Sequence, residues 1–296
     1  MASLLEIKKK INGVKGTRKI TKAMQLVAAS KMQYFQKRAL SMRKYIQDLL
    51  DLLELNISHK AKSIYTTRAK GSSRVLFVLY TSDKGLCGPL NTKLINTLVR
   101  SEEWNNLKED YRLLVTIGKK SFDFAKSNKI PVAKNITGFS EKLTTLESLK
   151  IIDQILEFWK DETISKIVFV SPHFKNSFTY YPVRKQYLPF SDKMMKEHIG
   201  DREIKKDPRK DFMLYEPTKE RMTEKLHKMI VQGTFMQAFL ELKAAEYSSR
   251  MLAMKNATDA ADKIIKNLTL SYNKARQAAI TQEIAELVGA SAAIQN

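Results

Sequence analysis

The sequence predicts an α/β domain inserted between two long helices that pair as an antiparallel coiled coil. Apolar residues recur at three- and four-residue spacing over residues 218–288, as they do along a coiled-coil seam. The same spacing recurs over residues 3–58. Between these ends, apolar runs of strand length alternate with helical segments, which is typical of a doubly wound, Rossmann-like α/β domain. We therefore expect an N-terminal coiled-coil helix (1–58), an inserted domain (74–192) and a C-terminal helix (212–296).

The C-terminal helix is too long for a compact domain. At 1.5 Å per residue, residues 218–288 span about 100 Å. Its apolar steps alternate between four and three, with two consecutive fours around Leu240, where a left-handed supercoil locally unwinds. Pro217 and Thr218 mark its start. A helix with such a seam needs a partner.

The N-terminal helix supplies that partner. Ser3 and Glu6 have the spacing of a capping box, so a helix should begin there. Because a single globular insert separates the two helices, they most simply lie antiparallel. The longer C-terminal helix should then extend past its partner from about Tyr272.

The insert alternates between strands and helices. Strands are expected at 74–80, 111–117, 131–136 and 167–170, and helices at 90–104, 119–128 and 143–159. Residues 178–190 contain Pro182 and Pro189, which favours a hairpin or an edge element. Residues 193–211 are charged and contain Gly and Pro, as a connector does.

Charge and composition restrict the partners. The net charge is +21, and no Asp or Glu occurs between Ile7 and Gln47, so an anionic partner is expected. No apolar run is long enough to span a membrane, and the N-terminus does not resemble a signal peptide. The single cysteine, Cys87, fits a reducing compartment.

No catalytic, metal-binding or cofactor-binding pattern emerges. Residues 81–89 follow the first strand, where Rossmann and P-loop proteins bind phosphate, but the glycine spacing of both motifs is missing. We interpret this loop as a tight turn, with surface recognition as the alternative. Cys87 has no evident His or Asp partner nearby in sequence that would activate it as a nucleophile. The four histidines lack metal-ligand spacing.

Two functions stay open beside a purely structural role: binding of nucleic acid by the basic N-terminal helix, and nucleotide-dependent catalysis by the α/β domain. Clustered Lys and Arg could neutralise phosphates along a nucleic-acid duplex, although the coiled-coil pattern and the few aromatic residues argue against it. A nucleotide-binding α/β enzyme would rest on fold analogy alone.

Four sequence blocks resemble the gamma-subunit family of F-type ATP synthases. Residues 20–32 (ITKAMQLVAASKM) are similar to its N-terminal signature, and residues 82–88 (SDKGLCG) to the loop after its first strand. Residues 246–260 (EYSSRMLAMKNATDA) and 272–290 (YNKARQAAITQEIAELVGA) are similar to its C-terminal signature. The region 90–211 matches only in pattern.

The resemblance implies a rotor shaft that is not itself catalytic and holds no cofactor or metal. Its partners would be the alpha and beta subunits of the catalytic ring, an epsilon subunit and the ring of membrane-embedded c subunits, with no nucleic acid. Without the cysteine insert of chloroplast members or a transit peptide, a bacterial protein is expected, peripheral on the cytoplasmic side of the inner membrane.

The resemblance also implies which residues contact the alpha–beta ring. Arg276 and Gln277 would hydrogen-bond loops of the catalytic subunits near the tip of the shaft. Met24, Lys31, Glu246 and Arg250 would lie in the coupling region. The stretch from Lys84 to Cys87 would lie near the lower rim of the beta subunits.

Overall fold

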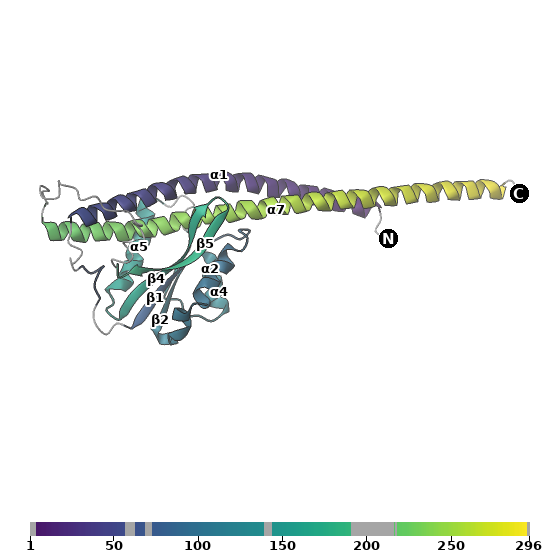
Figure 1. The fold of residues 1–296 in the computed structure, drawn as a ribbon. Coiled ribbons are helices and arrows are strands. Elements are labelled where there is room, and N and C mark those ends of the chain that lie inside the picture. Colours follow the sequence, from purple (N-terminus) through teal and green to yellow (C-terminus); the bar gives the residue numbers. More distant parts are fainter. Residues whose placement is uncertain are drawn as a thin grey trace. The chain divides into compact units, whose positions relative to one another are not determined.

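The computed structural model describes residues 4–56, 63–68, 73–138, 144–190, 216 and 218–294. The chain divides into two compact units, one made of residues 1–29 and 250–296 and the other of residues 30–249. The two long helices, α1 (Leu4–Asn56) and α7 (Lys219–Ile294), each contribute a stretch to both units (Figure 1). The predicted start of α7 is confirmed, since the Thr218 hydroxyl accepts a hydrogen bond from the Arg221 amide at 3.4 Å.

In the larger unit, residues 30–249, the two helices run antiparallel. Phe35 of α1 stacks on Tyr247 of α7, with ring centroids 5.6 Å apart. Further along, Ile46 lies against Gly233, where an added Cβ would come within 3.1 Å of the isoleucine side chain. The absence of a side chain at Gly233 therefore allows the two helices to approach closely.

The larger unit also contains a five-stranded sheet in the order β3-β2-β1-β4-β5 (Figure 1). Its strands are β1 (Arg74–Tyr80), β2 (Arg112–Ile117), β3 (Lys134–Ile136), β4 (Ile164–Asn176) and β5 (Thr179–Leu188). The first four pair in parallel and β5 pairs antiparallel with β4. Strand β1 lies at the centre and is almost wholly buried, which explains its unbroken apolar run.

Helices cover both faces of this sheet. The insert contains α2 (Leu90–Val99), α3 (Glu102–Asn106), α4 (Lys119–Ser127) and α5 (Thr145–Lys160), and a 3-10 turn at Glu109–Tyr111. Phe77 of β1 contacts Trp104 of α3 on one face. Tyr80, three residues on and so on the opposite face, contacts Phe235 of α7. Helix α7 thus forms part of the core of the α/β domain.

The doubly wound fold with two long helices is confirmed, with differences in detail. The prediction of a single helix over residues 90–104 is wrong, because this stretch forms two helices. Helix α2 ends at Val99, and the Ser101 hydroxyl caps the separate helix α3. Strand β4 is longer than the predicted 167–170 because it continues into a hairpin with β5, in which Pro172 lies opposite Pro182. The predicted connector 193–211 and the capping residue Ser3 lie outside the described residues.

In the smaller unit, α1 and α7 again pair antiparallel. The hydroxyl of Thr258 donates to that of Thr21 at 2.9 Å, and Arg18 forms an ion pair with Asp262. Ile11, Ala28 and Met254 are buried between the helices. Among the described residues of both units, no helix is long and apolar enough to cross a membrane.

Candidate partner interfaces

Within the larger unit, α7 is buried on every side over residues 239–249. A helix with no solvent-facing side is normally apolar all round, yet this stretch carries Glu241, Lys243 and Glu246. Buried charges need charged or hydrogen-bonding partners. The contacts of these three residues therefore show which elements α7 is bound to.

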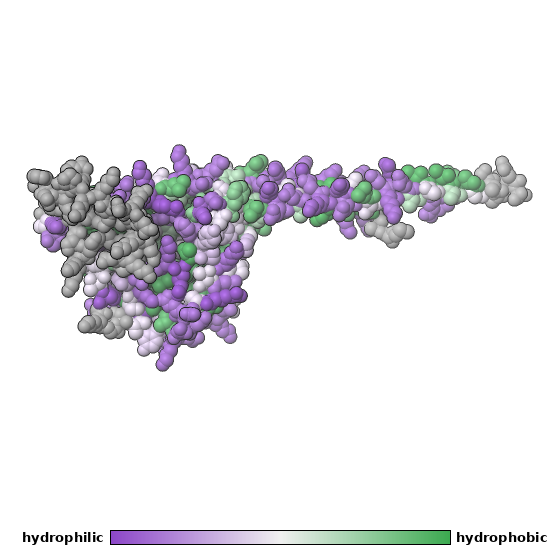
Figure 2. All heavy atoms as spheres, in the orientation of Figure 1, coloured by the Kyte–Doolittle hydropathy of each residue, from purple (hydrophilic) through white to green (hydrophobic). Residues whose placement is uncertain are grey.

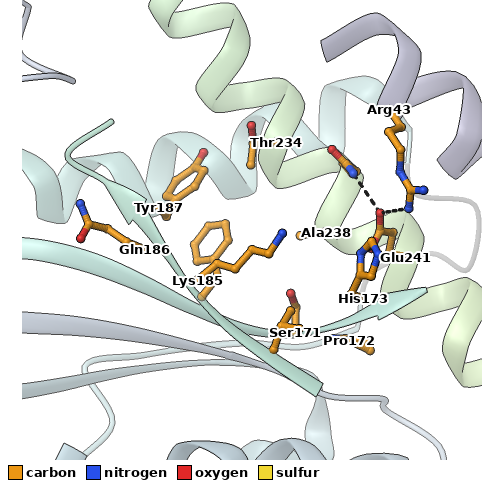
Figure 3. Close-up of a pocket in the computed structure, with 13 residues that line it drawn as sticks. Arg43, Ser171, Pro172, His173, Lys185, Gln186, Tyr187, Thr234, Ala238 and Glu241 are labelled. Atoms are coloured by element: carbon orange, nitrogen blue, oxygen red, sulfur yellow. Dashed lines mark hydrogen bonds and ion pairs between the residues drawn. The ribbon is translucent and has the colours of Figure 1, made fainter. Parts of the chain in front are cut away.

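Glu241 joins three elements of the larger unit. Its Oε1 accepts from Arg43 Nη2 of α1 at 2.7 Å and from Gln237 Nε2 at 2.9 Å. Its Oε2 contacts Nδ1 of His173 on β4 at 3.0 Å and accepts from the Phe174 amide at 3.1 Å. Figure 3 shows Arg43 and His173 converging on this carboxylate. The contacts fix the β4–β5 hairpin to both long helices.

These donors also keep Glu241 ionised. Burial alone would raise the pKa of this carboxyl, but the hydrogen bonds from His173, Arg43 and Gln237 outweigh it and lower the pKa to about 2. Sequence reasoning missed this network because its members are far apart in the chain. The one local signal is an acidic residue between Leu240 and Leu242, inside an apolar stretch.

Lys243 and Glu246 pair with each other, one turn further along α7. Their side-chain atoms lie 3.1 Å apart, and both residues are buried. The amine of Lys31 lies over the ring of the next residue, Tyr247, 5.4 Å from the ring centroid. Together with Asp83 and Lys84, the residues Lys243, Glu246 and Tyr247 line a cavity of about 660 Å³ at the carboxyl ends of β1, β2 and β3.

The loop that carries Cys87 is held by hydrogen bonds. Asn91 Oδ1 accepts from the Ser82 amide at 3.0 Å, and its Nδ2 donates to Cys87 Sγ at 3.3 Å. The Ser249 hydroxyl of α7 donates to the carbonyl of Cys87 at 2.6 Å. The Cys87 side chain is buried, whereas Lys84 and Leu86 beside it are exposed. This geometry is that of a tight turn held to α2 and α7.

At the carboxyl end of β2, the first backbone amides of α4 are bound by the chain itself. The Lys119 amide, at the start of α4, donates to Asp83 at 2.9 Å, and the Ser121 amide donates to Thr81 Oγ1 at 2.8 Å. Gly118 lies so close to Thr81 that a Cβ there would come within 2.1 Å of its carbonyl oxygen. Helix-terminal amides that bind phosphate must be open to it, so the N-terminus of α4 is not available as a phosphate site in this structure. No cluster of metal-ligating side chains occurs among the residues the structure describes.

The predicted ring-contact residues fall in both units. Lys31, Lys84, Cys87 and Glu246 lie in the larger unit, and Lys84 and Glu246 line the same cavity. Met24, Arg250, Arg276 and Gln277 lie in the smaller unit. There Arg276 and Gln277 are exposed, Met24 is half-buried and Arg250 is buried. Their roles as ring contacts stay predictions.

Over residues 280–290, the apolar side chains of α7 are exposed. Figure 2 shows hydrophobic residues gathered towards the C-terminal end of the helix. The exposed apolar residues here are Ile280, Ile284, Leu287 and Val288. Contiguous exposed apolar surface indicates an interaction site, so this end of α7 is the strongest candidate interface in the smaller unit.

The fold and its buried polar contacts define a class of protein: a coiled-coil chain whose inserted α/β domain packs on its own helices. Solved structures share this fold. A chain of the Euglena gracilis mitochondrial ATP synthase matches with a TM-score of 0.67 and 19% identity, covering 98% of this chain and 94% of that one. A chain of the central stalk and c-ring of the Tetrahymena thermophila enzyme matches with a TM-score of 0.57 and 23% identity, covering 80% and 99%.

The chain belongs to the ATP synthase gamma-chain family. The family model described as ATP synthase matches residues 3–294. The ATP synthase gamma chain of a Psychrobacter species is 36% identical and that of Heliobacterium modesticaldum 35% identical, each over 99% of this chain and 100% of the relative. The gamma chain of Dichelobacter nodosus is 33% identical over the same shares.

Proposed function

We propose that this chain is the central rotor shaft of an F-type ATP synthase, coupling ion flow through the membrane sector to ATP synthesis or hydrolysis at the alpha–beta ring. The similarity to bacterial gamma chains over the whole length of both sequences carries the proposal. The shaft is itself non-catalytic and acts by forcing the catalytic subunits through successive conformations.

The contacts of the larger unit support this role. A shaft must transmit torque without its parts slipping, and α7 is held by buried polar contacts to α1 through Arg43 and to the β4–β5 hairpin through His173. Because interiors pack at crystal-like density and resist deformation, such a body rotates as one piece. No contact of the described residues favours the nucleic-acid alternative.

The proposed partners follow from the gamma-chain family and its solved relatives. Arg276, Gln277 and the exposed apolar end of α7 would contact the alpha–beta ring. The c subunits and epsilon would bind the rotor at its other end, and the complex would place the chain at the cytoplasmic side of the inner membrane as a peripheral subunit. The titratable groups of the shaft would take no part in chemistry.

The proposal is tested by purification and rotation. A tagged full chain, expressed with the alpha and beta subunits of its host, should copurify with both in stoichiometric amounts and restore ATP hydrolysis to the gamma-free ring. A bead attached to the inserted domain should rotate in one direction when ATP is supplied. Purification without alpha and beta would overturn the proposal.

A further inference from the structure

A cavity of about 190 Å³ lies in the larger unit between α7 and the β4–β5 hairpin (Figure 3). Alternation along the strands directs Phe169, Ser171 and His173 of β4 to the same side as Lys185 and Tyr187 of β5, as period-two geometry requires. The facing residues of α7, at helical spacing, are Thr234, Gln237, Ala238 and Glu241. Because Ser171 and Ala238 are small, the helix and the hairpin leave a gap between them.

The cavity combines apolar walls with a small number of polar side chains. Phe169 stacks on Tyr187 with ring centroids 3.9 Å apart, and both rings are buried. Gln237 Oε1 is buried without a hydrogen-bond partner. Ligand sites are typically apolar pockets with few, well-placed polar groups.

The charges around the cavity favour an anion. Glu241 of α7 is matched by Arg43 of α1 and is contacted by His173 of β4. The remaining charged residue of the lining is Lys185 of β5. In Figure 3 its side chain extends across the sheet towards Ala238. After the Arg43–Glu241 pair is neutralised, one positive charge is left at the mouth.

We propose that this cavity binds a small organic carboxylate, with its carboxyl group on the Lys185 amine and its apolar body against Phe169 and Ala238. The volume fits a ligand of about the size of one aromatic ring, since an apolar cavity of about 150 Å³ binds benzene. Such a ligand bridges the hairpin and α7, so it stabilises their contact. The inference is independent of the rotor function.

The test uses benzoate as the probe and benzyl alcohol as its neutral counterpart, titrated into the full chain and followed by ligand-observed NMR and by the thermal midpoint. Benzoate should bind in the millimolar range expected of a fragment and should raise the midpoint. Lys185→Met, which keeps the apolar stem, should weaken benzoate binding about tenfold. Benzyl alcohol should bind the wild-type chain and this variant equally.

Two further variants distinguish binding of benzoate in the cavity from non-specific attraction of an anion to a basic protein. Lys175→Met removes an exposed lysine of β4 that does not line the cavity, and it should bind benzoate like the wild type. Ala238→Leu fills the cavity and should abolish binding. Absence of benzoate binding to the wild type, or equal binding by Lys185→Met and wild type, would show a cavity that holds only water and would overturn the inference.

Discussion

Glu241 on α7 and His173 on β4 lie 68 positions apart in sequence, and their side chains meet at 3.0 Å. The same carboxylate reaches Arg43, 198 positions away on α1. One buried side chain therefore links the N-terminal helix, the inserted domain and the C-terminal helix within the larger unit.

Glu241→Gln should destabilise the larger unit by about 3 kcal/mol, because a neutral amide cannot replace the charge-assisted hydrogen bonds that this buried carboxylate accepts. The amide of Gln can accept fewer hydrogen bonds than the four contacts that the carboxylate makes. Urea unfolding followed by circular dichroism measures the loss. Glu224→Gln, at an exposed position of the same helix, is the control and should change stability little. Equal midpoints for the two variants would contradict the assigned role.

The pH dependence of the unfolding free energy should show that ionised Glu241 stabilises the folded chain. Its folded-state pKa of about 2 lies below the reference value of 4.5, so the stability it contributes is fully present above pH 4.5. This contribution is lost as the pH falls from 4.5 towards 2, and it amounts to about 3 kcal/mol in total. The difference in unfolding free energy between wild type and Glu241→Gln should therefore shrink between pH 6 and pH 3. A difference that stays constant over this range would show that ionisation of Glu241 is not coupled to folding.

Gly118→Ala should be strongly destabilising. Gly118 has φ of +98°, and an added Cβ would lie 2.1 Å from the Thr81 carbonyl oxygen. The variant must strain the backbone or move the turn that caps α4, at a cost on the order of 3 kcal/mol. Gly85→Ala in the neighbouring loop has space for its methyl group and serves as the control. Thermal unfolding of the two variants compares the sites directly.

The sequence allowed the elements to be predicted where one physical signal dominated. Strand β1 begins and ends at the predicted residues because Val75 to Tyr80 are buried on both faces and form an unbroken run of apolar and aromatic residues. Strand β4 was predicted too short because Pro172 and His173 interrupt its apolar run. That stretch is nevertheless a strand because it pairs with β5. Pairing between strands is a tertiary contact, and the local sequence pattern around Pro172 does not reveal it.

The polar network could not be predicted from spacing. Because the four histidines lack metal-ligand spacing, the sequence predicts an ordinary role for His173. Its partner, Glu241, becomes a neighbour only when β4 packs under α7. The roles of Arg276 and Gln277 came from family resemblance alone, and the structure adds that both side chains are exposed.

The hydroxyl pair in the smaller unit should couple α1 to α7. Thr258 Oγ1 lies 2.9 Å from Thr21 Oγ1 and 2.8 Å from the Met254 carbonyl, and both threonines are buried. Thr21→Val or Thr258→Val alone should cost about 1 kcal/mol by leaving one hydroxyl without this partner. The double variant should cost less than the sum, as a double-mutant cycle in amide exchange of residues 4–29 would measure. Additive costs would mean that the pair is not coupled.

Arg276→Ala and Gln277→Ala should lower coupled ATP turnover while leaving the fold intact. Both side chains are exposed in the chain alone, so their removal should not shift the thermal midpoint. If they hydrogen-bond the catalytic subunits, each loss should reduce turnover of the assembled enzyme about threefold to tenfold. Lys274→Ala, an exposed change in the same turn of α7, controls for the loss of charge and side-chain bulk. Because the fold would be unaffected in all three variants, wild-type turnover for Arg276→Ala and Gln277→Ala would move the ring contact away from these residues and towards the exposed apolar side chains beyond them.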